Sequence, residues 1–145
     1  RPRAQDHAFG AQALETFSLT DRSQRLLDEV SGGQAQRAYL AMTFAQDTDW
    51  LLLDEPLNNL DMSHARALMQ QLSALVRQSG KSVVVVVHEV NYAAAWADHV
   101  VALKDGRVAA TGAPSEVLTA ETLSQLYDTE VEVTQHQGRP LVLHH

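Results

Sequence analysis

The chain has 145 residues, a net charge of −7 and no cysteine, which fits one acidic domain in a reducing cytosol, without a disulfide framework. Because nucleic acids are bound largely through neutralised phosphates, this acidic balance and the lack of a basic stripe argue against a nucleic-acid partner. Apolar runs such as Val83 to Val87 are far shorter than the roughly 20 residues that a transmembrane helix needs. We therefore expect no membrane span.

We expect residues 1–47 to be helical throughout. Apolar side chains recur at helical spacing in the first 28 residues, first around Phe9 and Phe17 and again at Leu26, which predicts two helical pieces. Ser31 then stands where a helix cap is favoured, before a helix expected to run to about Gln46. We interpret residues 1–47 as part of a helical subdomain that is distinct from residues 48–145.

Residues 48–145 begin with a strand–helix–strand pattern. Trp50–Leu53 and Ser82–Val87 are apolar runs of strand length, as expected for parallel strands that are covered on both faces. Between them, Met62–Ser79 has a single apolar stripe at helical spacing, and Gly80 follows as a helix-ending residue. This order predicts an α/β fold with a parallel-sheet core.

The last third of the chain predicts short elements. Asp105-Gly106 lies between two apolar segments and is a strong hairpin signal, and a second small hairpin is expected around Gly138-Arg139-Pro140. Short helices are expected over residues 91–98, from Pro114 onwards, and over residues 121–127.

The stretch Ser31-Gly32-Gly33-Gln34 has the composition of an anion site. Two glycines at a helix start expose backbone N–H groups, the helix contributes the positive end of its dipole, and Ser31 adds a hydroxyl. The alternative is an ordinary serine-capped helix, which an isolated Ser-Gly-Gly would favour.

Asp54 and Glu55 follow the first apolar strand, so both carboxylates should emerge at the sheet edge where α/β proteins bind ligands. A carboxylate such as Asp54 suits magnesium, often through water. Glu55 is placed to polarise an attacking water. The alternative is a solvated acidic pair at a strand end.

Two further residues stand at ends of expected elements. Asp61 precedes the Met62 helix and suits its N-cap position. His88 ends the second strand, where a histidine is usually structural or merely exposed.

Gly80-Lys81-Ser82 matches the end of a P-loop motif, but the position of the first glycine is Leu75, inside a helix. A P-loop also runs from strand to helix, whereas this segment runs from helix to strand. We interpret it as a helix stop.

In this order, the motifs resemble those of ABC (ATP-binding cassette) ATPases. Val30 to Gln34, followed by Gln36-Arg37, is similar to the family signature Leu-Ser-Gly-Gly-Gln, with valine for leucine. The strand ending in Asp54-Glu55 is similar to the Walker B motif. Asn59-Leu60-Asp61 is similar to the D-loop, although Leu57 replaces its usual small hydroxyl residue, and His88 is similar to the switch histidine. The fold implied is the C-terminal half of a P-loop NTPase (ABC ATPase) domain.

The resemblance implies ATP and Mg²⁺ as cofactors and a homodimer assembled head to tail, with each ATP lying between one subunit's P-loop and the other's signature. It also implies membrane permease partners and a cytoplasmic location, peripheral on the inner face of the cell membrane. The implied roles are ATP contact in the partner subunit by Ser31, Gly32, Gly33 and Gln34, magnesium binding through water by Asp54, catalysis by Glu55 and His88, and a place in the dimer seam for Asp61.

The C-terminal part of the sequence narrows the resemblance to prokaryotic importers. Residues 97–107 resemble that group, while residues 88–93 and 130–133 are similar to the iron-siderophore and haem branch. The printed residues hold no P-loop, which in this family would precede Arg1. We therefore expect the isolated chain neither to bind ATP tightly nor to hydrolyse it.

Two alternatives remain open. In the first alternative to an importer subunit, the chain is a non-catalytic, truncated interaction module that offers its signature to a full-length partner. In the second, it is part of a non-transport ABC ATPase of DNA repair or translation. The second is disfavoured, because those proteins usually carry coiled-coil or basic insertions, and this chain is compact and acidic.

Overall fold

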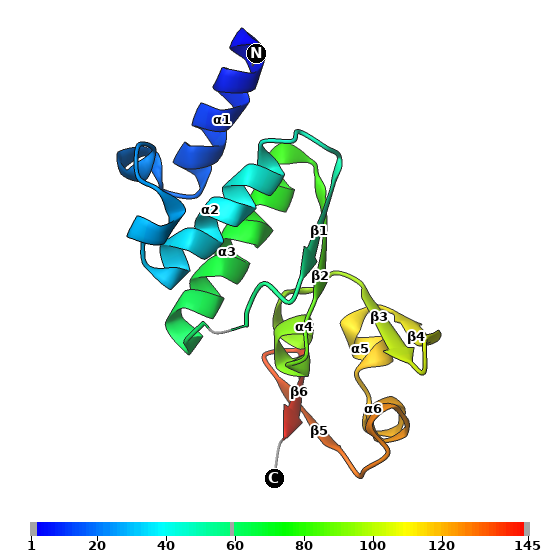
Figure 1. The fold of residues 1–145 in the computed structure, drawn as a ribbon. Coiled ribbons are helices and arrows are strands. Elements are labelled where there is room, and N and C mark those ends of the chain that lie inside the picture. The colour runs from blue at the N-terminus through cyan, green and yellow to red at the C-terminus, as the bar shows by residue number, and fades with distance from the viewer. Residues whose placement is uncertain (1–2, 59, 144–145) are drawn as a thin grey trace. The chain divides into compact units, whose positions relative to one another are not determined.

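A computed structural model gives the fold and describes residues 3–58 and 60–143. The chain divides into two compact units, residues 1–86 and 87–145 (Figure 1). The expected boundary of a helical subdomain after residue 47 stays a prediction.

The first unit opens with two α-helices, α1 (Ala4–Thr16) and α2 (Gly32–Phe44), which contact each other. Phe17, just after α1, and Phe44, at the end of α2, are both buried and meet edge to face, with ring centroids 6.1 Å apart. The predicted helix from Gly33 to about Gln46 is confirmed within two residues at its C-terminal end.

The second helical piece expected before residue 28 is not one continuous helix. The chain instead forms two short 3₁₀ turns, η1 (Thr20–Arg22) and η2 (Leu27–Glu29). Leu26 and Leu27 are exposed. A helix this short cannot offset its nucleation cost without packing of its apolar side chains, so the segment stays irregular.

The sheet of this unit has two parallel strands, β1 (Trp50–Asp54) and β2 (Ser82–Val86). Their register places Leu52 opposite Val84. Between them runs α3 (Met62–Ser79), which contacts β2 (Figure 1). Its predicted apolar stripe is confirmed, because the buried side chains of this helix are Ala65, Leu68, Met69, Leu72 and Leu75.

The two faces of this sheet differ. Leu51 is 1% exposed and Leu53 is buried, whereas Leu52, between them, is 72% exposed. On the same face as Leu52, Trp50, Val84 and Val86 are also exposed. Parallel sheets are normally covered on both sides, so burying this exposed apolar face would favour association of the chain.

We expect this face to drive self-association of the chain. The apparent mass of the unsubstituted protein in sedimentation velocity should rise above that of a monomer with concentration. The double variant Leu52→Lys and Val84→Lys should move it back toward the monomer. Leu103→Lys, which changes an exposed leucine in the second unit, serves as the control and should leave association unchanged. A monomer at every concentration would contradict this expectation.

The second unit contains two antiparallel hairpins, β3 (Val100–Lys104) with β4 (Arg107–Gly112) and β5 (Glu132–His136) with β6 (Arg139–Leu143). Both predicted hairpins are confirmed. Asp105 and Gly106 have φ values of 50° and 72°, which is the backbone that a two-residue turn between twisted strands requires. The helices of the second unit are α4 (Val90–Trp96), α5 (Pro114–Val117) and α6 (Ala120–Tyr127).

Asn91 joins α4 to β6 as a strand would. Its Nδ2 donates to the Val142 carbonyl at 3.0 Å, and its Oδ1 accepts from the Val142 N–H at 2.8 Å. The surrounding core consists of Val90, Ala94, Ala102, Val117, Leu118, Leu123 and Val142.

None of the helices within residues 3–58 and 60–143 is long and apolar enough to cross a bilayer.

Candidate nucleotide-contact site

The N-terminus of α2 carries the predicted anion-contact residues. Ser31 occupies the N-cap position, and its N–H donates to Oε1 of Gln34 at 3.2 Å. Within the described residues, the Ser31 hydroxyl makes no capping hydrogen bond. The position of the predicted cap is therefore right, but the reciprocal Gln34 side chain provides the bond.

The fold itself does not require glycine at either position of the pair. Neither Gly32 nor Gly33 has a positive φ. Among the described residues, and leaving aside its own chain neighbours and helix backbone, a methyl group at Gly32 would have no heavy atom within 4 Å. A methyl group at Gly33 would lie 3.6 Å from Cδ2 of His64, which is an ordinary van der Waals distance. Glycine in a helix is less favourable than alanine by about 1 kcal/mol. The pair therefore lowers stability without a steric reason inside the chain.

This leads to a stability prediction. Gly32→Ala and Gly33→Ala should leave the free energy of unfolding unchanged or raise it by up to about 1 kcal/mol each, because alanine restricts the unfolded chain and suits the helix. Urea denaturation followed by circular dichroism measures the change. Gly80→Ala is the control and should destabilise, because Gly80 ends α3 with a φ of 67°. Losses at Gly32 and Gly33 equal to the Gly80 loss would show that the fold needs both glycines.

Asp54 and Glu55 lie where the sequence predicts, at the carboxyl end of β1. Asp54 is the last strand residue and is exposed. Glu55 has a φ of 47°, and its N–H donates to the Val86 carbonyl at 3.2 Å, which extends the pairing of β1 with β2. Its carboxylate accepts a hydrogen bond from Nδ2 of Asn58.

The left-handed backbone of Glu55 costs about 1–2 kcal/mol for a residue with a side chain. The hydrogen bonds of Glu55 to Val86 and Asn58 hold this conformation.

A bond that the sequence did not predict connects the two motif regions. Nε2 of Gln36, in α2, donates to the carbonyl of Pro56, directly after Glu55. In the sequence, Gln36 stands out only as part of the signature-like motif. Nothing in the local sequence indicates a partner 20 residues away.

Asp61 caps α3, as its sequence position suggested. Its Oδ1 accepts from the His64 N–H and from the Ser63 hydroxyl, each at 2.9 Å, and its Oδ2 lies 2.8 Å from Nδ1 of His64. These bonds, led by that of the His64 backbone N–H, hold the pKa of the Asp61 carboxyl far below its usual range. The predicted D-loop includes Asn59, which lies outside the described residues.

The lowered pKa of Asp61 gives stability a pH dependence of known sign. A carboxyl whose pKa is depressed by folding contributes its full stability above the unfolded pKa of about 4 and loses it as the pH falls toward the folded pKa. The difference in unfolding free energy between the wild type and Asp61→Asn should therefore shrink as the pH falls below about 4. Urea midpoints across that range test this, and a difference that stays constant down to about pH 2.5 would contradict it.

His88 lies in the second unit, is exposed, and follows the end of β2 by two residues. The next residue, Glu89, caps α4 by accepting from the Asn91 N–H at 3.2 Å. The expected approach of His88 to the nucleotide acted on by Glu55 stays a prediction.

The residues present suit magnesium only in combination with a nucleotide. Within the described residues, no group of three histidine, cysteine or acidic side chains could hold a metal ion. Mg²⁺ is usually bound by one or two carboxylates, waters and substrate phosphates. The exposed carboxylate of Asp54 meets the protein's part of that requirement.

The segment resembling the end of a P-loop is a helix stop, as interpreted from the sequence. Gly80 has the left-handed backbone of a helix end. Lys81 has a side chain only 12% exposed, and its Nζ lies 2.9 Å from Oδ1 of Asp47 and 2.8 Å from the Thr48 carbonyl. Lys81 therefore fastens the end of α3 to the loop before β1.

Known proteins share both sequence and fold with this chain. Residues 4–58 match the family described as ABC transporter. YclP of Bacillus subtilis (strain 168), a petrobactin import ATP-binding protein, is 46% identical over 122 residues, which are 84% of this chain and 48% of YclP. HmuV of Bordetella parapertussis, a hemin import ATP-binding protein, is 41% identical over 142 residues, with 90% of this chain and 54% of HmuV covered.

A solved structure described as an inward-facing metal-chelate type ABC transporter superposes with a TM-score of 0.87 at 26% identity, covering 99% of this chain and 59% of that chain. Fold and motifs together define the class of the protein as an α/β ATP-binding cassette, of which about half is present. In sequence and in fold, the chain is similar to the ATP-binding proteins of ABC transporters. It spans about half the length of the curated relatives that it matches.

Proposed function

We propose that this chain is the C-terminal half of the ATP-binding and ATP-hydrolysing subunit of an ABC importer for iron-siderophore or haem complexes. The petrobactin and hemin import proteins among its relatives support this substrate class, as does its likeness to a metal-chelate type transporter. The subunit would act at the cytoplasmic face of the membrane with permease subunits.

The observation that carries the proposal is the glycine pair at the start of α2. Gly32 and Gly33 are exposed or half-buried, have room for a side chain, and reduce helix stability. A ligand that approaches the backbone closely explains glycine at such a position. The N-terminus of a helix favours a phosphate.

We assign the signature residues Ser31, Gly32, Gly33 and Gln34 to the ATP held by a second subunit in a head-to-tail homodimer. Their backbone N–H groups and the Ser31 hydroxyl are suited to donate to phosphate oxygens. Asp61 would lie along the seam between the two subunits.

We assign the strand-end residues to the chain's own ATP. Asp54 would hold Mg²⁺ through water, and the metal would neutralise phosphate charge. Glu55 would accept a hydrogen bond from the attacking water and orient it, and His88 would contact the γ-phosphate. The bond from Gln36 to Pro56 supports a fixed spacing between the Glu55 loop and the signature helix.

The experiment that tests this function compares the chain alone with a joined cassette, in which the part of YclP that the match does not cover precedes these residues. The chain alone should show no micromolar affinity for a fluorescent ATP analogue. The joined cassette should bind the analogue and hydrolyse ATP with magnesium. A folded joined cassette that binds ATP but does not hydrolyse it would contradict the catalytic assignment.

The second candidate that the sequence leaves open is a non-catalytic module that offers its signature to a full-length partner. Adding the chain to intact YclP distinguishes the two. A module should change the ATPase rate of YclP, whereas half of a catalytic subunit should leave that rate unchanged.

A further inference from the structure

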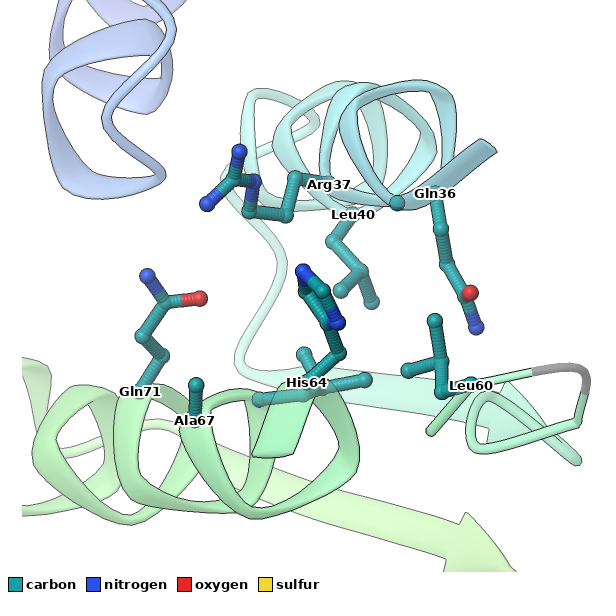
Figure 2. Close-up of a pocket in the computed structure, with 9 residues that line it drawn as sticks. Gln36, Arg37, Leu40, Leu60, His64, Ala67 and Gln71 are labelled. Atoms are coloured by element: carbon teal, nitrogen blue, oxygen red, sulfur yellow. The ribbon is translucent and has the colours of Figure 1, made fainter. Parts of the chain in front are cut away.

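A small cavity of about 30 Å³ lies between the start of α2 and the first turns of α3. Residues that line it include Gly33 and Arg37 of α2, and His64 and Gln71 of α3. Figure 2 shows the His64 ring pointing from α3 toward α2, with Arg37 and Gln71 on one side and Gln36 and Leu60 on the other. The cavity has room for about one water molecule, and His64 forms part of its wall.

His64 bonds Asp61 and lies beside the start of α2. Its Nδ1 lies 2.8 Å from Oδ2 of Asp61. Because a carboxylate only accepts, Nδ1 carries the proton of this bond. On the other side, the ring lies beside Gly33, where a methyl group would be 3.6 Å from Cδ2 and 4.0 Å from Nε2.

Among the described residues, the His64 ring beside Gly33 is one approach of α2 to the loop that follows β1. Another is the bond from Gln36 to the Pro56 carbonyl. Gln36 meets the beginning of the loop, directly after Glu55, and His64 meets its end through Asp61. The start of α2 is therefore fixed against both ends of the loop.

We propose that His64 is a positioning residue that holds the Asp61 loop against the start of α2, and thereby aims the backbone N–H groups of Gly32 and Gly33 at the ATP of a second subunit. The identity of that ligand rests on the proposed function. The link from Asp61 through His64 to Gly33 is a property of these residues alone.

Because His64 and Asp61 are exposed, the effect of their bond on position can be told apart from its effect on stability. The side chains of His64 and Asp61 are 60% and 64% exposed. Exposed ion pairs contribute little to the free energy of unfolding. Small errors in the placement of groups around a reacting phosphate, in contrast, lower rates strongly.

The first test uses the 145-residue chain and nuclear magnetic resonance. Asp61→Asn keeps a capping side chain and the His64 ring, but weakens the bond to Nδ1, so the Gly33 amide resonance should shift. Ser63→Ala is the matched control, because Ser63 bonds Oδ1 of Asp61 and not Oδ2, and it should leave Gly33 unshifted. A Gly33 resonance that is equally unaffected by both changes would overturn the proposed link.

The second test uses the joined cassette. His64→Ala should lower kcat about tenfold, with KM changed less than about twofold, because the signature acts on the reacting complex rather than on binding to the chain's own site. His64→Asn places an amide donor near the position of Nδ1 and should restore most of kcat. Ser63→Ala should leave kcat unchanged.

The outcomes separate the two proposals. An unaltered kcat in His64→Ala, or a His64→Asn variant as slow as His64→Ala, overturns the positioning role while the proposed function stands. A joined cassette that does not hydrolyse ATP before any substitution contradicts the proposed function. In that case the Gly33 resonance alone decides whether the link exists.

Discussion

Glu55→Gln in the joined cassette should lower the rate of ATP hydrolysis by about 100-fold or more, while the affinity for ATP stays the same. Glutamine preserves the size of the side chain and its acceptor for Asn58, but it is a poor base for the attacking water. Proton transfer or orientation by a positioned carboxylate contributes about 10²–10⁴ in rate. Single-turnover hydrolysis and a fluorescent-nucleotide titration measure the two quantities separately.

Glu89→Gln is the matched control for this experiment. Glu89 also follows a strand by a few residues, but its carboxylate caps α4, and a carbamoyl oxygen accepts the same bond from Asn91. The control should hydrolyse ATP at close to the unsubstituted rate. Equal turnover in Glu55→Gln and Glu89→Gln would remove Glu55 from its catalytic assignment.

Leu51→Ala should lower the free energy of unfolding by about 2–5 kcal/mol. Leu51 is 1% exposed, so the substitution leaves a cavity in the core beneath the sheet. Urea denaturation at a concentration low enough to keep the protein monomeric gives the value.

Leu52→Ala is the control, because the neighbouring side chain points to the opposite face and is 72% exposed. Its effect should stay within about 0.5 kcal/mol of zero. Similar losses at both positions would contradict the register of β1 with β2 and the assignment of its buried face.

Several elements were predictable because their signals are local. The stripe in Met62–Ser79 repeats every three to four residues, and Gly80 supplies the left-handed helix end, so both bounds of α3 follow from the sequence. The turn at Asp105-Gly106 is equally local, since only certain residues adopt positive φ at both positions. The strand-end acids were also predictable, because the apolar run stops at Leu53 and the two acids follow it directly.

Other features depended on distant partners. The segment around Leu26 has helical spacing, yet its leucines are exposed and it forms only short turns. Asn91 looked like an ordinary helix residue, but its side chain pairs with Val142, 51 residues away. The Ser31 hydroxyl suited a cap by residue type, whereas Gln34 supplies the bond.

The sequence by itself determined the α/β class, the order of the motifs and the acids at the end of β1, because these depend on periodicity and on neighbours along the chain. Only the tertiary structure decided that Gln36 bonds Pro56 and that the His64 ring lies between Asp61 and Gly33. The reason is geometric. Such contacts depend on how α2 and α3 pack together, and residue spacing along one element carries no information about the packing of two.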